Sequence, residues 1–143
     1  MNTSMALVIV VVIGVLGVGF VVGRLMTRRA GMLRAAAEDA PAEDVDTSDL
    51  GLSGTGPTIV HFTAVWCGPC AAVRRVVSQV CGDLRAVEHV EIDMDANPAA
   101  ARRLSVLSLP TTFIFDAQGR QRFRATGVPK AADLRSALEP LLA

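Results

Sequence analysis

The most apolar part of the chain is a continuous run near its N-terminus, at residues 5–23. Its 19 positions, MALVIVVVIGVLGVGFVVG, carry no charged and no strongly polar side chain. As a helix this run would span about 28 Å, close to the thickness of the hydrocarbon layer of a bilayer. The pattern predicts a single transmembrane helix in contact with membrane lipid, preceded by an N-terminal tail of residues 1–4.

A cleaved signal peptide is the alternative interpretation of this run. Such a peptide has basic residues before its apolar stretch and a small-residue cleavage site after it. Residues 1–4 read MNTS and contain no lysine or arginine. We therefore favour a helix that remains in the chain.

Basic residues follow the apolar run instead of preceding it. They are Arg24, Arg28, Arg29 and Arg34. Because loops rich in lysine and arginine tend to stay in the cytoplasm, the pattern predicts a single-pass protein of the cell membrane with its soluble domain in the cytoplasm. The extracytoplasmic orientation is the alternative.

Residues 24–56 join the apolar run to the rest of the chain. After the basic juxtamembrane part, residues 35–56 contain six acidic residues and no basic one, among Ala, Pro, Ser and Gly. Such a stretch buries little surface and repels itself, so we expect an extended, flexible tether. Leu50 and Leu52 could add a short edge strand to the domain.

From residue 57 onward, apolar positions switch between strand-like and helix-like patterns. Residues 58–65, TIVHFTAV, are β-branched and mostly apolar, as in a strand buried on both faces. Valines then recur at helical spacing over residues 71–81. Further strands are expected at 86–95, 111–116 and 121–127, and further helices at 97–106 and 129–142. This order predicts an α/β domain over residues 57–143, with a partly parallel sheet covered by helices.

The length and the charge balance of the chain limit the number of domains and the kinds of partner that we expect. The chain has 143 residues, enough for one domain of ordinary size. Its 14 basic residues balance 14 acidic ones. A nucleic-acid surface would need a clear basic excess, so we expect no nucleic-acid partner.

The candidate chemistry is a cysteine pair, Cys67 and Cys70, in the sequence WCGPC between the first strand and its helix. A structural zinc site usually needs four ligands, and the spacing of His61, His89 and Cys81 fits no zinc motif, so we expect no metal. A disulfide across so short a loop would stabilise the fold little. At a helix N-terminus, however, the first cysteine is favoured as a thiolate, and the second can attack a mixed disulfide formed by the first.

These residues resemble the thioredoxin family over roughly residues 57–142. The resemblance rests on WCGPC after an apolar strand, on Asn97-Pro98, on the segment 106–111 that ends in Pro110-Thr111, and on Gly127. It implies a thioredoxin fold, a central mixed sheet flanked by helices, although the family's first strand and helix have no clear counterpart here.

The resemblance also implies roles for individual residues. Cys67 would be the nucleophile and Cys70 the resolving cysteine, joined as a redox-active disulfide when oxidised. Pro110 would be cis, and substrate would dock beside it as an added strand. Substrate contacts would come from Trp66, Gly68, Pro69, Leu109, Pro110 and Gly127.

Two polar positions depart from the family pattern. The family's buried aspartate in the first core strand is His61 here, and its lysine in the next strand is Glu91. We infer that the two lie on adjacent strands under the active site as a charge-swapped pair, with His61 as general base for Cys70. The alternative is that His61 is a packed strand residue. Cys81 is expected in the core, and His89 on a strand face away from any site.

The sequence therefore predicts a membrane-anchored protein-disulfide reductase without a cofactor. The Gly-Pro dipeptide resembles reducing members of the family. Its partners would be disulfide-containing proteins and an electron donor, either a thioredoxin reductase in the cytoplasm or a membrane carrier outside it. An extracytoplasmic reductase in cytochrome maturation or envelope redox control is one alternative, and a non-catalytic docking module of the same fold is the other.

Overall fold

The computed structural model describes residues 3–28, 31–35 and 46–143. Two compact units divide the chain, Met1–Ala30 and Gly31–Ala143. The first contains helix α1 (Thr3–Arg28), in which Ser4–Met26 has a mean hydropathy of 3.1 and no buried residue. Within the described residues it is the one helix long and apolar enough to cross a membrane, a property that a signal sequence shares.

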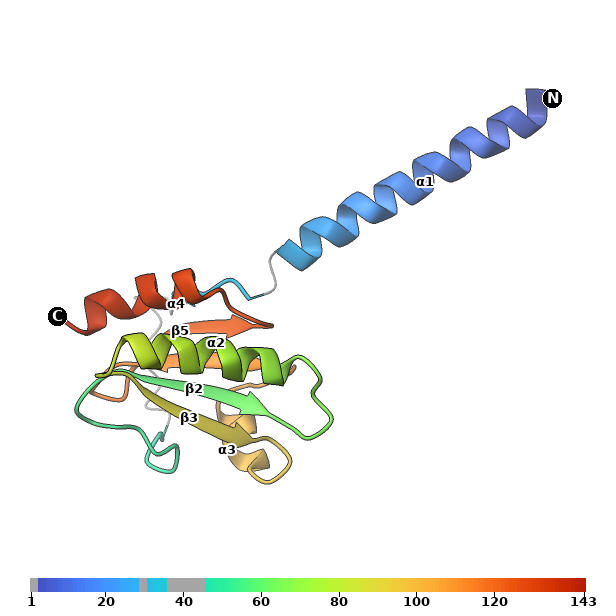
Figure 1. Ribbon diagram of the computed structural model, residues 1–143. Coiled ribbons are helices and arrows are strands. Elements are labelled where there is room, and N and C mark those ends of the chain that lie inside the picture. The colour runs from blue at the N-terminus through green and yellow to red at the C-terminus, as the bar shows by residue number, and fades with distance from the viewer. Residues whose placement is uncertain (1–2, 29–30, 36–45) are drawn as a thin grey trace. The chain divides into compact units, whose positions relative to one another are not determined.

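The second unit is built on a five-stranded mixed sheet with the order β1-β5-β4-β2-β3 (Figure 1). Parallel pairing joins β2 to β3, and the other neighbours are antiparallel. The strands are β1 (Arg34–Ala35), β2 (Thr58–Thr63), β3 (Glu88–Asp93), β4 (Thr111–Phe115) and β5 (Gln121–Thr126). The mixed sheet predicted from the sequence is thus confirmed.

Helices cover both faces of this sheet. Helix α2 (Cys70–Asp83) and helix α4 (Ala131–Leu138), which continues into a 3-10 turn at Glu139–Leu141, pack their valines and leucines on one face. Helix α3 (Pro98–Arg103) packs on the other face against the phenylalanines of the central strands. Because β2 has strands on both sides and helices above and below, all six of its residues are buried. This buried interior strand carries the cysteine motif at its end.

The second compact unit starts at Gly31, earlier than the predicted start of the domain at residue 57. The backbone N–H of Gly31 donates to the carbonyl oxygen of Thr126, and β1 pairs with β5. Leu33 packs against the core between these contacts. The edge of β5 offers backbone groups for pairing, and the short segment of residues 31–35 satisfies part of them.

The predicted edge strand at Leu50 and Leu52 is wrong, although both side chains are used. Leu50 lies in a turn and is only 2% exposed, and Leu52 packs against the same core cluster. Arg103 of α3 holds the segment in place, since it pairs with Asp49 and donates to the backbone oxygen of Asp46. Of the predicted acidic tether, residues 36–45 lie outside the described residues, whereas residues 46–56 are described and include the buried Leu50.

Candidate active site

The cysteine motif occupies the connection from the end of β2 to the start of α2. Cys67 N–H donates to the backbone oxygen of Ala64 at 3.0 Å, and Cys70 N–H donates to that of Cys67 at 3.3 Å. Pro69 immediately precedes the helix, where its missing N–H leaves no bond unmade. A tight turn thus sets both cysteines on the helix N-terminus.

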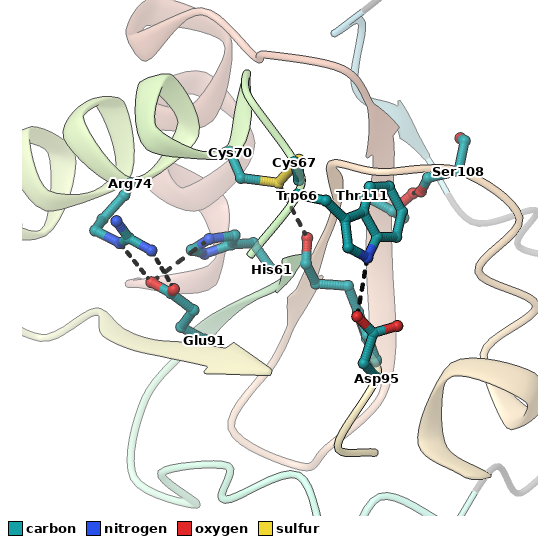
Figure 2. Close-up of a disulfide and its surroundings, with 10 residues drawn as sticks. His61, Trp66, Cys67, Cys70, Arg74, Glu91, Asp95, Ser108 and Thr111 are labelled. Carbon is teal, nitrogen blue, oxygen red and sulfur yellow. Dashed lines mark hydrogen bonds and ion pairs between the residues drawn. A yellow bond between two sulfur atoms is a disulfide. The ribbon is translucent and has the colours of Figure 1, made fainter. Parts of the chain in front are cut away.

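Cys67 and Cys70 are joined by a disulfide, with 5.5 Å between their Cα atoms (Figure 2). Cys70 is 2% exposed, whereas Cys67 is partly exposed and Gly68 and Pro69 are exposed. Sulfur of Cys70 lies 4.0 Å from the backbone oxygen of Phe62 in β2. An incoming sulfur can therefore reach Cys67, while Cys70 is held above the central strand.

The proline segment lies at the same end of the sheet as the motif. The Leu109–Pro110 peptide bond is cis, as predicted. Thr111, the next residue, is paired with Phe62 in antiparallel register, so Pro110 lies beside the last residue of β2, Thr63. The backbone N–H of Gly127 donates to the oxygen of Pro110 at 2.9 Å, which places the predicted glycine beside the proline.

Large apolar side chains are exposed on the loops that carry the motif and the proline segment. Val65 is 95% exposed, Trp66 63% and Leu107 91%. Trp66 is held by a hydrogen bond from its Nε1 to Asp95 Oδ2 at 2.9 Å (Figure 2). Val65 and Leu107 were not among the predicted contacts, although Val65 directly precedes the motif and Leu107 lies within the segment 106–111. Exposed apolar surface of this kind suits contact with a partner.

His61 and Glu91 lie directly opposite each other on β2 and β3, which confirms their predicted adjacency. His61 Nε2 is 3.7 Å from Glu91 Oε2. Glu91 is not paired with His61 alone, because the guanidinium of Arg74 on α2 binds both of its carboxylate oxygens. Arg74 was not among the predicted site residues, although its position one helical turn after Cys70 indicates that it lies near the motif.

His89 belongs to the same cluster, which corrects its predicted placement away from any site. Its Nε2 lies 2.8 Å from His61 Nδ1, and the two rings are 5.0 Å apart. His89 and Glu91 are two residues apart on β3, so their side chains leave the same face of the sheet. The alternation of side chains along β3, combined with the parallel pairing of β2 and β3, was the signal that could have placed His89 beside His61.

Burial decides the protonation of these groups. It lowers the pKa of His61 to about 4, with a further decrease from His89 that outweighs the opposing effect of Glu91. Burial likewise lowers the pKa of His89. The hydrogen bonds from Arg74 lower the pKa of Glu91. At neutral pH the cluster therefore consists of two neutral imidazoles beside a carboxylate–guanidinium pair.

One nitrogen in the cluster has no hydrogen-bond partner among the described residues. It is His61 Nε2, in a side chain that is fully buried. Figure 2 shows this ring beneath the disulfide, with Glu91 and Arg74 on its far side. A buried polar atom without a partner is uncommon in folded proteins and is often associated with chemistry.

His61, His89 and Glu91 each offer a ligand atom, all within 4.8 Å of one another. A zinc ion usually takes four ligands, and here Arg74 already neutralises the carboxylate while the imidazoles bond to each other. The cluster is arranged as a hydrogen-bonded network. The expectation that the site holds no metal stays a prediction.

Cys81 lies near the end of α2 and is half-buried against the valine cluster. Burial raises the pKa of its thiol, which favours the unreactive protonated form. This position agrees with the expected packing role.

Comparisons with known proteins agree with this geometry. Residues 48–140 match the thioredoxin family. The chain is 37% identical over 114 residues to a thioredoxin of Mycolicibacterium smegmatis, covering 77% of this chain and all of that protein. It is 38% identical over 86 residues to a bifunctional thioredoxin reductase/thioredoxin of Mycobacterium leprae, covering 59% of this chain and 19% of that protein.

Solved structures give the same result for the fold. A chloroplastic thioredoxin z aligns with a TM-score of 0.56 and 32% identity, covering 61% of this chain and 79% of that one. The thioredoxin fold expected from the sequence is confirmed.

Proposed function

Because the chain belongs to the thioredoxin family and holds a Cys67–Cys70 disulfide at a helix N-terminus, we propose that it is a membrane-anchored reductase of protein disulfides. Thiol–disulfide exchange itself follows from the family and the cysteine pair. The direction of exchange, the anchor and the roles of the surrounding residues are the proposal. The carrying observation is the unequal exposure of the two cysteines, since Cys67 is partly exposed and Cys70 is buried.

In the reductive direction the cycle starts from the dithiol. The thiolate of Cys67, stabilised by the N-terminus of α2, attacks a substrate disulfide and releases the first substrate thiolate. Cys70 then attacks the sulfur of Cys67 in the mixed disulfide and releases the second. The substrate is reduced by two electrons, and the protein returns to its disulfide. A thioredoxin reductase, or a membrane electron donor if the domain lies outside the cytoplasm, would restore the dithiol.

Substrate would bind around the exposed sulfur. Trp66 and the backbone beside Leu109 and Pro110 border it, and a substrate strand can pair with backbone groups there. The exposed apolar side chains Val65 and Leu107 would widen this surface. Gly68, Pro69 and Gly127 would allow close approach because they present little bulk.

The buried thiol of Cys70 must lose its proton before it can attack. His61 lies at the centre of β2, next to the residue whose carbonyl contacts Cys70, and its Nε2 has no partner. We assign it as the general base for this step. Its neutral state at pH 7 leaves one ring nitrogen able to accept a proton.

Turnover of insulin disulfides by the full chain in detergent micelles, with dithiothreitol as reductant, tests the activity. We expect Cys67→Ser to reduce turnover to the uncatalysed rate and Cys70→Ser to accumulate the mixed disulfide. Cys81→Ser is the matched control and should keep wild-type turnover. A wild-type chain with no activity above background would instead support a docking module.

A further inference from the structure

His61, the proposed base for Cys70, must pass on the proton that it accepts. His61 is fully buried, so a proton that it accepts has no direct contact with water. Burial also makes a lasting positive charge on this ring unfavourable, as its low pKa shows. Efficient turnover therefore requires that the proton move on.

The contact between the two imidazoles offers a route. His61 Nδ1 and His89 Nε2 are 2.8 Å apart, a hydrogen bond in which one nitrogen donates and the other accepts. His89 is partly exposed, in contrast to His61. The pair thus connects a buried ring with one that reaches the surface.

We propose that His89 relays the proton of Cys70 from His61 to solvent, a role that rests on the proposed disulfide reduction. In the active tautomer, His61 Nδ1–H donates to His89 Nε2 and His61 Nε2 is bare, consistent with its lack of a partner. His89 is a relay residue, since it acts through His61 and does not touch the reacting sulfurs.

Protons balance at each step of this relay. His61 Nε2 takes the proton of the Cys70 thiol, and His61 gives its Nδ1 proton to His89 Nε2. His89 releases its Nδ1 proton to water, and both rings end as neutral Nε2–H tautomers. When the disulfide is reduced again, Cys70 leaves as a thiolate, recovers a proton from His61 Nε2, and the relay runs in reverse.

The charged neighbours of the pair favour the active tautomer. Glu91 Oε2, 3.7 Å from His61 Nε2, would attract a proton onto that nitrogen and block it. Arg74 engages both oxygens of Glu91 and offsets this attraction. Glu91 and Arg74 are the charged groups acting on the two imidazoles, from β3 and α2.

The test is the rate of mixed-disulfide resolution in a single turnover of the reduced full chain in detergent, followed from pH 5.5 to 9.5. Trp66, the one tryptophan in the sequence, lies beside the disulfide and offers a fluorescence signal. We expect His89→Ala to slow resolution about tenfold near pH 7. This is less than the roughly 10²–10⁴-fold contribution of a direct acid–base group, because His89 acts one step away from the thiol. The rate should approach that of the wild type where the thiol ionises unaided. Added imidazole should restore much of the rate at pH 7.

Glu88→Gln on the same strand is the matched control, since Glu88 is exposed and outside the cluster; its profile should match the wild type. Slowing of His89→Ala that is equal at all pH values and insensitive to imidazole would assign His89 a structural role and overturn the relay. An unchanged His89→Ala profile in an active chain would also overturn it while leaving disulfide reduction intact. Inactivity of the wild type would instead reject the proposed function.

Discussion

His61 shows how one buried side chain links chemistry to stability. Its imidazole lies on the central strand, fully removed from water, and is held neutral by burial. Protonation of the ring in the folded protein would place a charge where water cannot solvate it. The same feature that keeps the ring ready to accept a proton therefore makes the fold sensitive to acid.

Unfolding at different pH values measures this effect. The pKa of His61 is about 4 when folded, against an ordinary value of 6.5, so between these values the unfolded chain binds a proton that the folded chain does not. The free energy of unfolding should fall by roughly 3 kcal/mol as the pH drops from 7 to 4. Urea titrations of the oxidised wild type and His61→Asn should show that the variant lacks this part of the decrease. Parallel pH dependences of the two proteins would contradict the assignment.

At the scale of elements, the edge of the sheet is shaped by the segment that follows α1. Gly31 has φ +82°, and a Cβ atom there would lie 2.1 Å from the backbone oxygen of Val128. Only glycine allows the chain to approach this closely, and the approach aligns β1 with β5. One residue thus decides whether the segment of residues 31–35 can join the sheet.

Replacement of Gly31 by alanine should therefore detach β1. Gly54→Ala is the matched control, because Gly54 also has a positive φ of 69° but open space where its Cβ would be. The control should cost about 1–2 kcal/mol from backbone strain alone. Gly31→Ala should cost more and should increase hydrogen exchange at β5, whose edge loses its partner. Equal destabilisation and equal exchange in the two variants would show that β1 does not depend on the close approach.

At the scale of the whole molecule, the sequence predicted those structural features that depend on the local pattern of apolar residues. The apolar β-branched run of β2 and the valine stripe of α2 placed the cysteine turn between a strand and a helix. The family resemblance added the cis-proline and the pairing of His61 with Glu91. Features that depend on distant partners were missed. β1 is only two residues long, too short for a strand pattern, and Leu33 before it finds its core contacts only in the folded protein. His89 joins the site only once β2 and β3 are set in register.

If α1 spans the membrane as proposed, the side on which the cysteine pair works is a property of the whole chain. Arginines after the apolar helix favour a cytoplasmic domain, and this choice decides which electron donor can restore the dithiol. In a background of Cys67→Ser, Cys70→Ser and Cys81→Ala, we expect Ser48→Cys to react with an impermeant maleimide only after cells are permeabilised. Asn2→Cys, the reciprocal variant, should react in intact cells.

The reverse labelling pattern would place the domain outside the cytoplasm and would favour a membrane electron donor over a thioredoxin reductase. A shortened chain that is labelled at Ser48→Cys in intact cells would instead identify α1 as a cleaved signal sequence. In each case the cysteine chemistry of Cys67 and Cys70 is unchanged, because it is set by the turn at the end of β2. The side of the membrane determines which disulfides can reach Cys67. The orientation of the chain therefore selects the substrates of the proposed reductase.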